Sequence, residues 1–231
     1  MSLGSRKFVF SGALSVFVLA GCGGPGMKIP SDFAEGLKEM STKGRGSNVQ
    51  GEKGFEFGPY SVTDVERGKS SASGWDVIEG FKPAKDGGFR YSFKGGADRT
   101  LIGKCAPAKG EKAGEFSIGD ELEAVGCTCQ KGTKSVAHLF VEDLAGEYAG
   151  PLVVGDVEVR ATGIYRLAND KQLKVPVGYR VDDESGPVGG VQVLPGKTTA
   201  WIRGDLRKLD RQGLACLFAG LMLYVPPERG D

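Results

Sequence analysis

Apolar and polar side chains alternate along much of the chain beyond residue 54. Phe89, Tyr91 and Phe93 alternate with Arg90 and Ser92, and residues 157–167 and 173–181 show the same period. A period of two places successive side chains on opposite faces of a strand. These three segments predict clear strands. Weaker ones bring the number to about ten and lie at 55–66, 99–105, 120–130, 135–142, 147–154, 187–194 and 197–203.

Turn-forming residues separate several of these segments. Residues 86–88, 95–98, 168–170 and 182–186 are rich in glycine, asparagine and aspartate. These residue types tolerate a positive φ or hydrogen-bond to their own backbone, as short hairpin connections require. Short strands joined in this way predict an antiparallel meander.

The last part of the chain changes from strand to helix character. Asp205 is a suitable cap for a helix over residues 205–225, and Pro226 and Pro227 end it. Residues 213–225 contain no charged side chain, so every face of this helix must be covered by lipid or protein. Thirteen residues extend only about 20 Å, less than the roughly 30 Å of a bilayer core. Protein must therefore surround the helix.

A meander that encloses a helix on all sides must close into a barrel. Eight strands leave room only for side chains, whereas about eleven can hold a helix. The predicted fold class is therefore mainly β, an antiparallel barrel closed around a C-terminal apolar helix. The small residues Gly213, Ala215, Ala219 and Gly220 would let the wall approach that helix closely. A β-sandwich with the helix packed on one open face is the alternative.

This arrangement resembles the tubby-like fold, which the phospholipid scramblases share. The resemblance covers residues 55–225, and residues 210–221 are similar in composition to the terminal helix of that family. It implies a twelve-stranded barrel around a central helix. Members are associated with membrane lipids, which basic side chains on the barrel wall hold. No such basic site can be mapped onto this sequence, so no binding residue is carried over.

The first residues have the pattern of an export signal. Arg6 and Lys7 precede an apolar run over residues 8–19, which is too short to span a membrane. The run ends in Leu19-Ala20-Gly21-Cys22, which resembles the lipobox of bacterial lipoproteins. The resemblance implies a signal peptide over 1–21 and a lipid on Cys22 that anchors the chain to the cell membrane surface. Gly23, which is not aspartate, directs such proteins to the outer membrane in a cell with two membranes.

Composition and charge limit the expected partners and indicate how the chain is divided into a tether and a folded domain. Cleavage would remove two basic and no acidic residues, so the formal net charge would fall from +1 to −1 over 210 residues. This near-neutral balance excludes nucleic acid as an expected partner. Residues 22–53 have few apolar side chains and predict a flexible tether, with one short helix after Ser31 from the spacing of Phe33, Leu37 and Met40. Residues 54–231 predict a single barrel domain.

Four cysteines remain besides Cys22. In an oxidising compartment, Cys105, Cys127, Cys129 and Cys216 can form two disulfides in three connectivities. Cys127 and Cys129 are two apart on one strand and are not expected to pair, so Cys105 is expected to pair with one of them. Cys216 is expected to be a buried thiol. A metal site of Cys127, Cys129 and either Cys105 or His138 is an alternative that lacks the usual spacing.

The sequence contains none of the common catalytic motifs. Its single histidine, His138, is expected on a strand, and no nucleophile with a matched base, cofactor motif or metal motif is visible. The acidic clusters at 142–143 and 182–184 are expected in turns, and a carboxylate pair or a calcium site is the alternative. Arg203, Arg207, Lys208 and Arg211 form a basic group that could touch lipid head groups or a partner.

Three functions follow as hypotheses. The first is a non-catalytic envelope lipoprotein that binds a partner, such as another envelope protein, or supports structure. The second is a lipid-binding or lipid-handling module, and the third is an enzyme of unknown class. A cavity beside the helix would favour the second, and carboxylates clustered near His138 would favour the third.

Overall fold

The computed structural model describes residues 25–45, 54–68, 78, 88–95, 97–108, 124–144, 146–194 and 198–224. Within these ranges a short 3-10 helix, twelve strands and one α-helix are present. They are η1 (Ser31–Ala34), β1 (Leu37–Lys43), β2 (Phe55–Phe57), β3 (Tyr60–Arg67), β4 (Phe89–Gly95), β5 (Ala97–Ala108), β6 (Ala124–Lys131), β7 (Lys134–Leu144), β8 (Glu147–Val154), β9 (Val157–Ile164), β10 (Gly178–Asp183), β11 (Gly186–Gln192), β12 (Thr199–Arg203) and α1 (Lys208–Leu223).

The strands form one closed antiparallel barrel. From β2 to β12 each strand pairs with its neighbour in sequence, and β1 closes the ring between β12 and β2. The closing contacts run from Leu37↔Arg203 to Ser41↔Thr199 on one side of β1 and include Thr42↔Phe57 on the other. The predicted barrel is confirmed, and the alternative of a β-sandwich is wrong because the meander has no open face.

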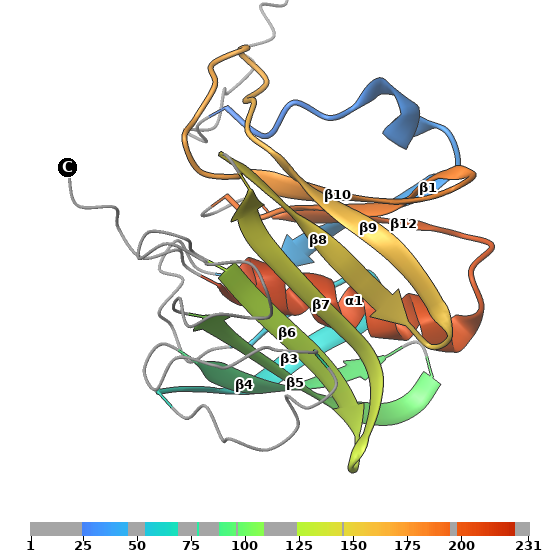
Figure 1. The fold of residues 1–231 in the computed structure, drawn as a ribbon. Helices are drawn as coiled ribbons and strands as arrows, with labels where there is room; N and C mark the ends of the chain where they lie inside the picture. The colour runs from blue at the N-terminus through green and yellow to red at the C-terminus, as the bar shows by residue number, and fades with distance from the viewer. Residues whose placement is uncertain are drawn as a thin grey trace, which may run out of the picture.

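The helix α1 lies inside this barrel, with strands on either side of it (Figure 1). Every residue from Gln212 to Leu223 is buried. A Cβ added at Gly220 would lie 2.4 Å from the Cys105 sulfur, and one at Gly213 would lie 3.1 Å from the Ala137 Cβ. The wall therefore approaches the helix where the sequence provides its smallest side chains. None of the described helices is long and apolar enough to cross a membrane.

Both ends of the helix differ slightly from the predicted bounds. Arg207, not Asp205, is the N-cap residue, and it makes no capping hydrogen bond through its side chain. At the other end Arg45 donates to the Met222 carbonyl, and Arg67 donates to the Leu223 carbonyl at 3.1 Å. These cations satisfy carbonyls that have no partner within the helix and oppose its dipole. Burial, together with the charge of Arg67, lowers the pKa of Arg45 to about 10.

The first strand corrects the prediction of a tether over residues 22–53. Within the described part of this range, residues 25–45, only Ser31–Ala34 is helical. The chain then runs as β1 through Leu37–Lys43, where Met40 alone is buried. With one buried side chain in seven residues, β1 shows no alternation that the sequence could reveal. Its place is fixed by pairing with β12 and β2, a long-range contact that local periodicity does not report.

Two strand bounds also differ from the prediction. The segment 55–66 is a hairpin of β2 and β3, because Gly58 adopts a positive φ of 54° in the turn that joins them. The predicted strand 173–181 begins only at Gly178. Pro176 lies just before it and has no N–H to donate to a ladder, which explains why the alternating residues ahead of it stay outside the barrel sheet.

A second, smaller cluster of buried side chains contains Met27, Phe33, Leu167, Val177 and Trp201. It joins the segment before β1 to the connection between β9 and β10, which lie beside each other at the top of Figure 1. Met27 pairs with Leu167 in an isolated bridge, and its N–H donates to the Gln192 side chain at 3.1 Å. The chain is therefore part of the folded body from about residue 26 onward.

Candidate binding site at the rim of the barrel

One disulfide connects the central helix to the barrel wall, and a second joins two neighbouring strands of that wall. Cys105 and Cys127 are opposite each other on β5 and β6 and are bonded, with Cα atoms 4.1 Å apart. Cys129 on β6 is bonded to Cys216 on α1, with Cα atoms 6.3 Å apart. The predicted presence of disulfides is confirmed. The prediction of a free thiol at Cys216 is wrong, and the alternative of a metal site fails because all three candidate cysteines are already bonded.

A buried tyrosine strengthens the same junction. The Tyr91 hydroxyl on β4 donates to the Cys216 carbonyl at 2.6 Å, and the Tyr91 side chain is fully enclosed. Burial raises the pKa of this phenol well above its usual value, so it stays protonated and remains a donor. The hydrogen bond and the Cys129–Cys216 disulfide hold one face of the helix against β4 and β6, and the Cys105–Cys127 disulfide links β6 to β5.

No catalytic residue was predicted, and His138 and the acids at 182–183 lie on different strands, β7 and β10. His138 lies half-buried on β7, between Thr128 and Val153 on the neighbouring strands. Burial lowers the pKa of this imidazole, and the charge of Glu158 opposes that shift. Among the described residues, no group of three or more histidine, cysteine, aspartate or glutamate side chains could hold a metal ion.

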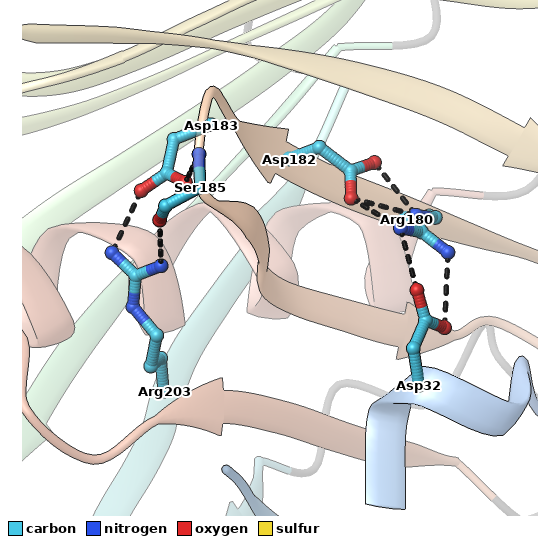
Figure 2. A network of polar contacts seen from close by, with 6 residues as sticks. All are labelled: Asp32, Arg180, Asp182, Asp183, Ser185 and Arg203. Carbon is cyan, nitrogen blue, oxygen red and sulfur yellow. Dashed lines mark hydrogen bonds and ion pairs between the residues drawn. The ribbon is translucent and has the colours of Figure 1, made fainter. Parts of the chain in front are cut away.

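The acidic cluster at 182–184 is engaged in ion pairs (Figure 2). Asp182 and Asp32 share Arg180, at 2.6 and 2.8 Å, which ties η1 to β10. Asp183 pairs with Arg203 at 2.7 Å on β12. Hydrogen bonds from Arg203 and Ser185 lower the pKa of Asp183 to about 2.

These two ion-pair groups lie on opposite faces of the hairpin formed by β10 and β11: Arg180 and Asp182 point toward Asp32, and Asp183 points toward Arg203 (Figure 2). Each of the two arginines is paired with two carboxylates, Arg180 with Asp32 and Asp182 and Arg203 with Asp183 and Asp205. Because these side chains are engaged with one another, the arrangement is structural in character.

The expectation that these acids lie in a turn is right only for Glu184, because Asp182 and Asp183 are the last two residues of β10. Ser185, in the turn, donates its N–H and its hydroxyl to Asp183.

An apolar pocket of about 200 Å³ opens beside the first turns of the helix. Its walls come from β8, β9 and β11 and from the helix itself, and Asp183, Arg203 and Asp210 stand among them as charged members. Val157, which is 48% exposed, also contributes. The apolar members are Leu152, Val154, Val157, Val159, Val188, Leu206 and Leu214. The pocket thus lies between the barrel wall and the start of the helix.

A basic cleft of about 390 Å³ adjoins the apolar pocket, because Asp210 belongs to both. Arg99, Lys131, Lys134 and Arg207 line it with two acids, Asp156 and Asp210. Arg207 pairs with Asp210 at 2.7 Å. Leu209, which is 43% exposed, lies in the same cleft. The rim therefore combines an excess of positive charge with exposed apolar side chains.

The sequence identified only one cation of this cleft. Of the basic group that the sequence marked near the start of the helix, Arg207 lines the cleft. Arg203 pairs with Asp183, and Arg211 donates to the Gly204 carbonyl at 3.1 Å. Arg99 lies on β5, Lys131 ends β6 and Lys134 begins β7. Only the closure of the barrel brings these strands next to the helix. The spacing of Lys131 and Lys134 around a two-residue turn was the available signal.

The predicted signal peptide and Cys22 lie outside the described residues. The fold defines a class: a closed, twelve-stranded antiparallel β-barrel with disulfides and a C-terminal helix packed inside it. No protein-family model, curated protein or solved structure matches this chain.

Proposed function

We propose that this protein is a non-catalytic lipoprotein of the bacterial envelope, anchored through lipid on Cys22, that binds a partner at the barrel rim. The observation that carries the proposal is the pair of disulfides inside the barrel, whose four cysteines are all fully buried. Disulfides persist in oxidising compartments and are rare in the reducing cytosol. They therefore support export, which the signal sequence and lipobox independently predict.

The interior of the barrel favours a scaffold over an enzyme. The helix fills the space in which a substrate would otherwise bind, and its residues from Gln212 to Leu223 are all buried. His138 and the acids at 182–183 lie on separate strands with separate partners. This arrangement offers a rigid surface for recognition.

The apolar pocket bears on the second candidate, a lipid-handling module. Pockets that enclose small ligands usually measure about 300–1,000 Å³. A pocket of about 200 Å³ suits a short apolar group, such as one or two side chains of a partner, better than a two-chain phospholipid. The adjacent basic cleft adds a preference for an acidic neighbour, so an envelope protein with an apolar anchor beside carboxylates fits the rim best.

The closed barrel around a C-terminal helix supports the resemblance to the tubby-like fold on architecture alone. Because one fold hosts many functions, that resemblance adds no binding residue to the proposal. The rim is proposed from its own side chains.

The test is fractionation of cells that express the natural chain or Cys22→Ala, with mass spectrometry of the N-terminal peptide. We expect a diacylglyceryl-modified Cys22 in the membrane fraction of the natural chain and a soluble, unmodified alanine form. An unmodified Cys22 on a chain in the soluble fraction would overturn the anchored-lipoprotein proposal.

A further inference from the structure

The distance between the proposed anchor and the folded body is very short. The described chain begins at Pro25, and Gly26 already accepts a hydrogen bond from the Ala168 N–H at 2.7 Å. Cys22 lies three positions before Pro25. An extended chain covers at most about 3.6 Å per residue. If Cys22 carries lipid, as the proposed function requires, the barrel cannot move more than about 10 Å from the membrane surface at this point.

The segment at the anchor has a defined inner and outer face. Met27 pairs with Leu167, and the Lys28 N–H donates to the Arg166 carbonyl at 2.8 Å. Arg166 in turn pairs with Gln172. Because side chains alternate along extended segments, Met27 and Leu167 point into the second cluster while Lys28 and Arg166 point outward.

The outer face is basic and carries an exposed apolar side chain. We call Lys28, Ile29, Arg166, Lys171 and Lys174 the anchor-proximal face. All five are exposed, and Ile29 is 49% exposed. One acid, Asp170, lies among them and pairs with Lys28. Four cations against one acid leave this face with a net positive charge.

We infer that the anchor-proximal face rests on the membrane, with its cations against anionic phospholipid head groups and Ile29 at the level of the head groups. A membrane surface is the occupant because the lipid on Cys22 holds this face within reach of it. The negative potential of an anionic leaflet extends about one Debye length, roughly 8 Å in physiological salt, which is comparable to the reach of the three-residue link.

This placement also orients the molecule. β9 runs from Val157 at the apolar pocket to Ile164 next to the second cluster, and an eight-residue strand covers about 25 Å. The rim with its pocket and basic cleft therefore lies about one strand length from the anchor-proximal face. A barrel held in this way presents its rim to the envelope space and not to the lipid.

The test uses the full-length, lipidated chain in vesicles of phosphatidylethanolamine and phosphatidylglycerol. A benzophenone amino acid replaces either Ile29, on the anchor-proximal face, or Val157, at the apolar pocket of the rim. The exposed fractions of these two side chains are nearly equal, 49% and 48%. After irradiation, mass spectrometry measures lipid adducts at each position and the state of Cys22. We expect a severalfold higher adduct yield at position 29 than at position 157.

Charge reversal provides the second arm. Lys171→Glu with Lys174→Glu should lower the adduct yield at position 29 severalfold, and Lys131→Glu with Lys134→Glu, the matched change at the rim, should leave it unchanged. Equal yields at positions 29 and 157 on a chain whose Cys22 is lipidated would overturn the inferred orientation and leave the proposed function standing. An unmodified Cys22 would overturn both.

Discussion

The disulfide between Cys129 and Cys216 should contribute more to stability than the one between Cys105 and Cys127. It closes a chain segment of 87 residues, whereas the other closes 22. Cross-linking removes conformational entropy from the unfolded chain, and the loop-length relation gives about 4.6 kcal/mol for the longer segment and about 3.4 kcal/mol for the shorter. The expected difference is about 1 kcal/mol.

Two double substitutions isolate this difference. Cys129→Ala with Cys216→Ala and Cys105→Ala with Cys127→Ala each remove two sulfurs from fully buried positions. Because the loss of packing is similar, the difference between the two variants reports mainly the length of the closed loop. Urea denaturation, followed through the fluorescence of the buried Trp201, gives the free energy of unfolding of each variant and of the natural chain.

The expected order of stability is the natural chain, then the variant without Cys105–Cys127, then the variant without Cys129–Cys216. Reduction of the natural chain should lower its free energy of unfolding below that of either variant, since it breaks both bonds. The variant without Cys129–Cys216 releases the helix from the wall. If it were as stable as the variant without Cys105–Cys127, the length of the closed loop would not determine how much each disulfide stabilises the fold.

Two further predictions concern packing and charge. Gly220→Ala should lower the free energy of unfolding by about 1–3 kcal/mol, because its Cβ would meet the Cys105 sulfur at 2.4 Å; Gly204→Ala, with no atom within 4 Å, is the control in the same urea assay. Asp183, whose pKa falls to about 2 beside Arg203, stabilises the fold above its unfolded pKa of about 3.9, and this contribution is lost as the pH falls through 2. Asp183→Asn should therefore cost about 1 kcal/mol at pH 6 and have no effect near pH 1.5. Equal destabilisation at both pH values would show that the loss is not due to charge.

Sequence patterns predicted those parts of the fold in which burial follows a local period. The alternation of Phe89, Tyr91 and Phe93 matches three side chains that are buried in β4. The charge-free run at 213–225 required enclosure on all sides, and that requirement alone predicted barrel closure. In both cases the same side chains that form the local pattern also form the core.

Other features depend on contacts between distant segments, and these were missed. Met40 is the one buried residue of β1, so no periodicity marked this strand. The pairing of Cys216 depends on how the helix is rotated within the barrel, which the composition of an all-round apolar helix does not define. The cations of the basic cleft come from β5, the β6–β7 turn and the start of the helix.

The position of β1 shortens the link expected between the barrel and the proposed lipid anchor. A tether of 32 residues, as the sequence predicted for 22–53, would leave the barrel free to rotate and to reach partners about 30 Å from the bilayer. The fold instead uses residues 25–45 to build the second cluster and close the barrel, so a lipid on Cys22, as we propose, would be joined to the folded body through residues 22–24 alone. Under this proposal a short link would orient the barrel, because the fold determines which face lies next to the lipid. The surface that we propose for binding, where the apolar pocket and the basic cleft share Asp210, lies about one strand length from that face.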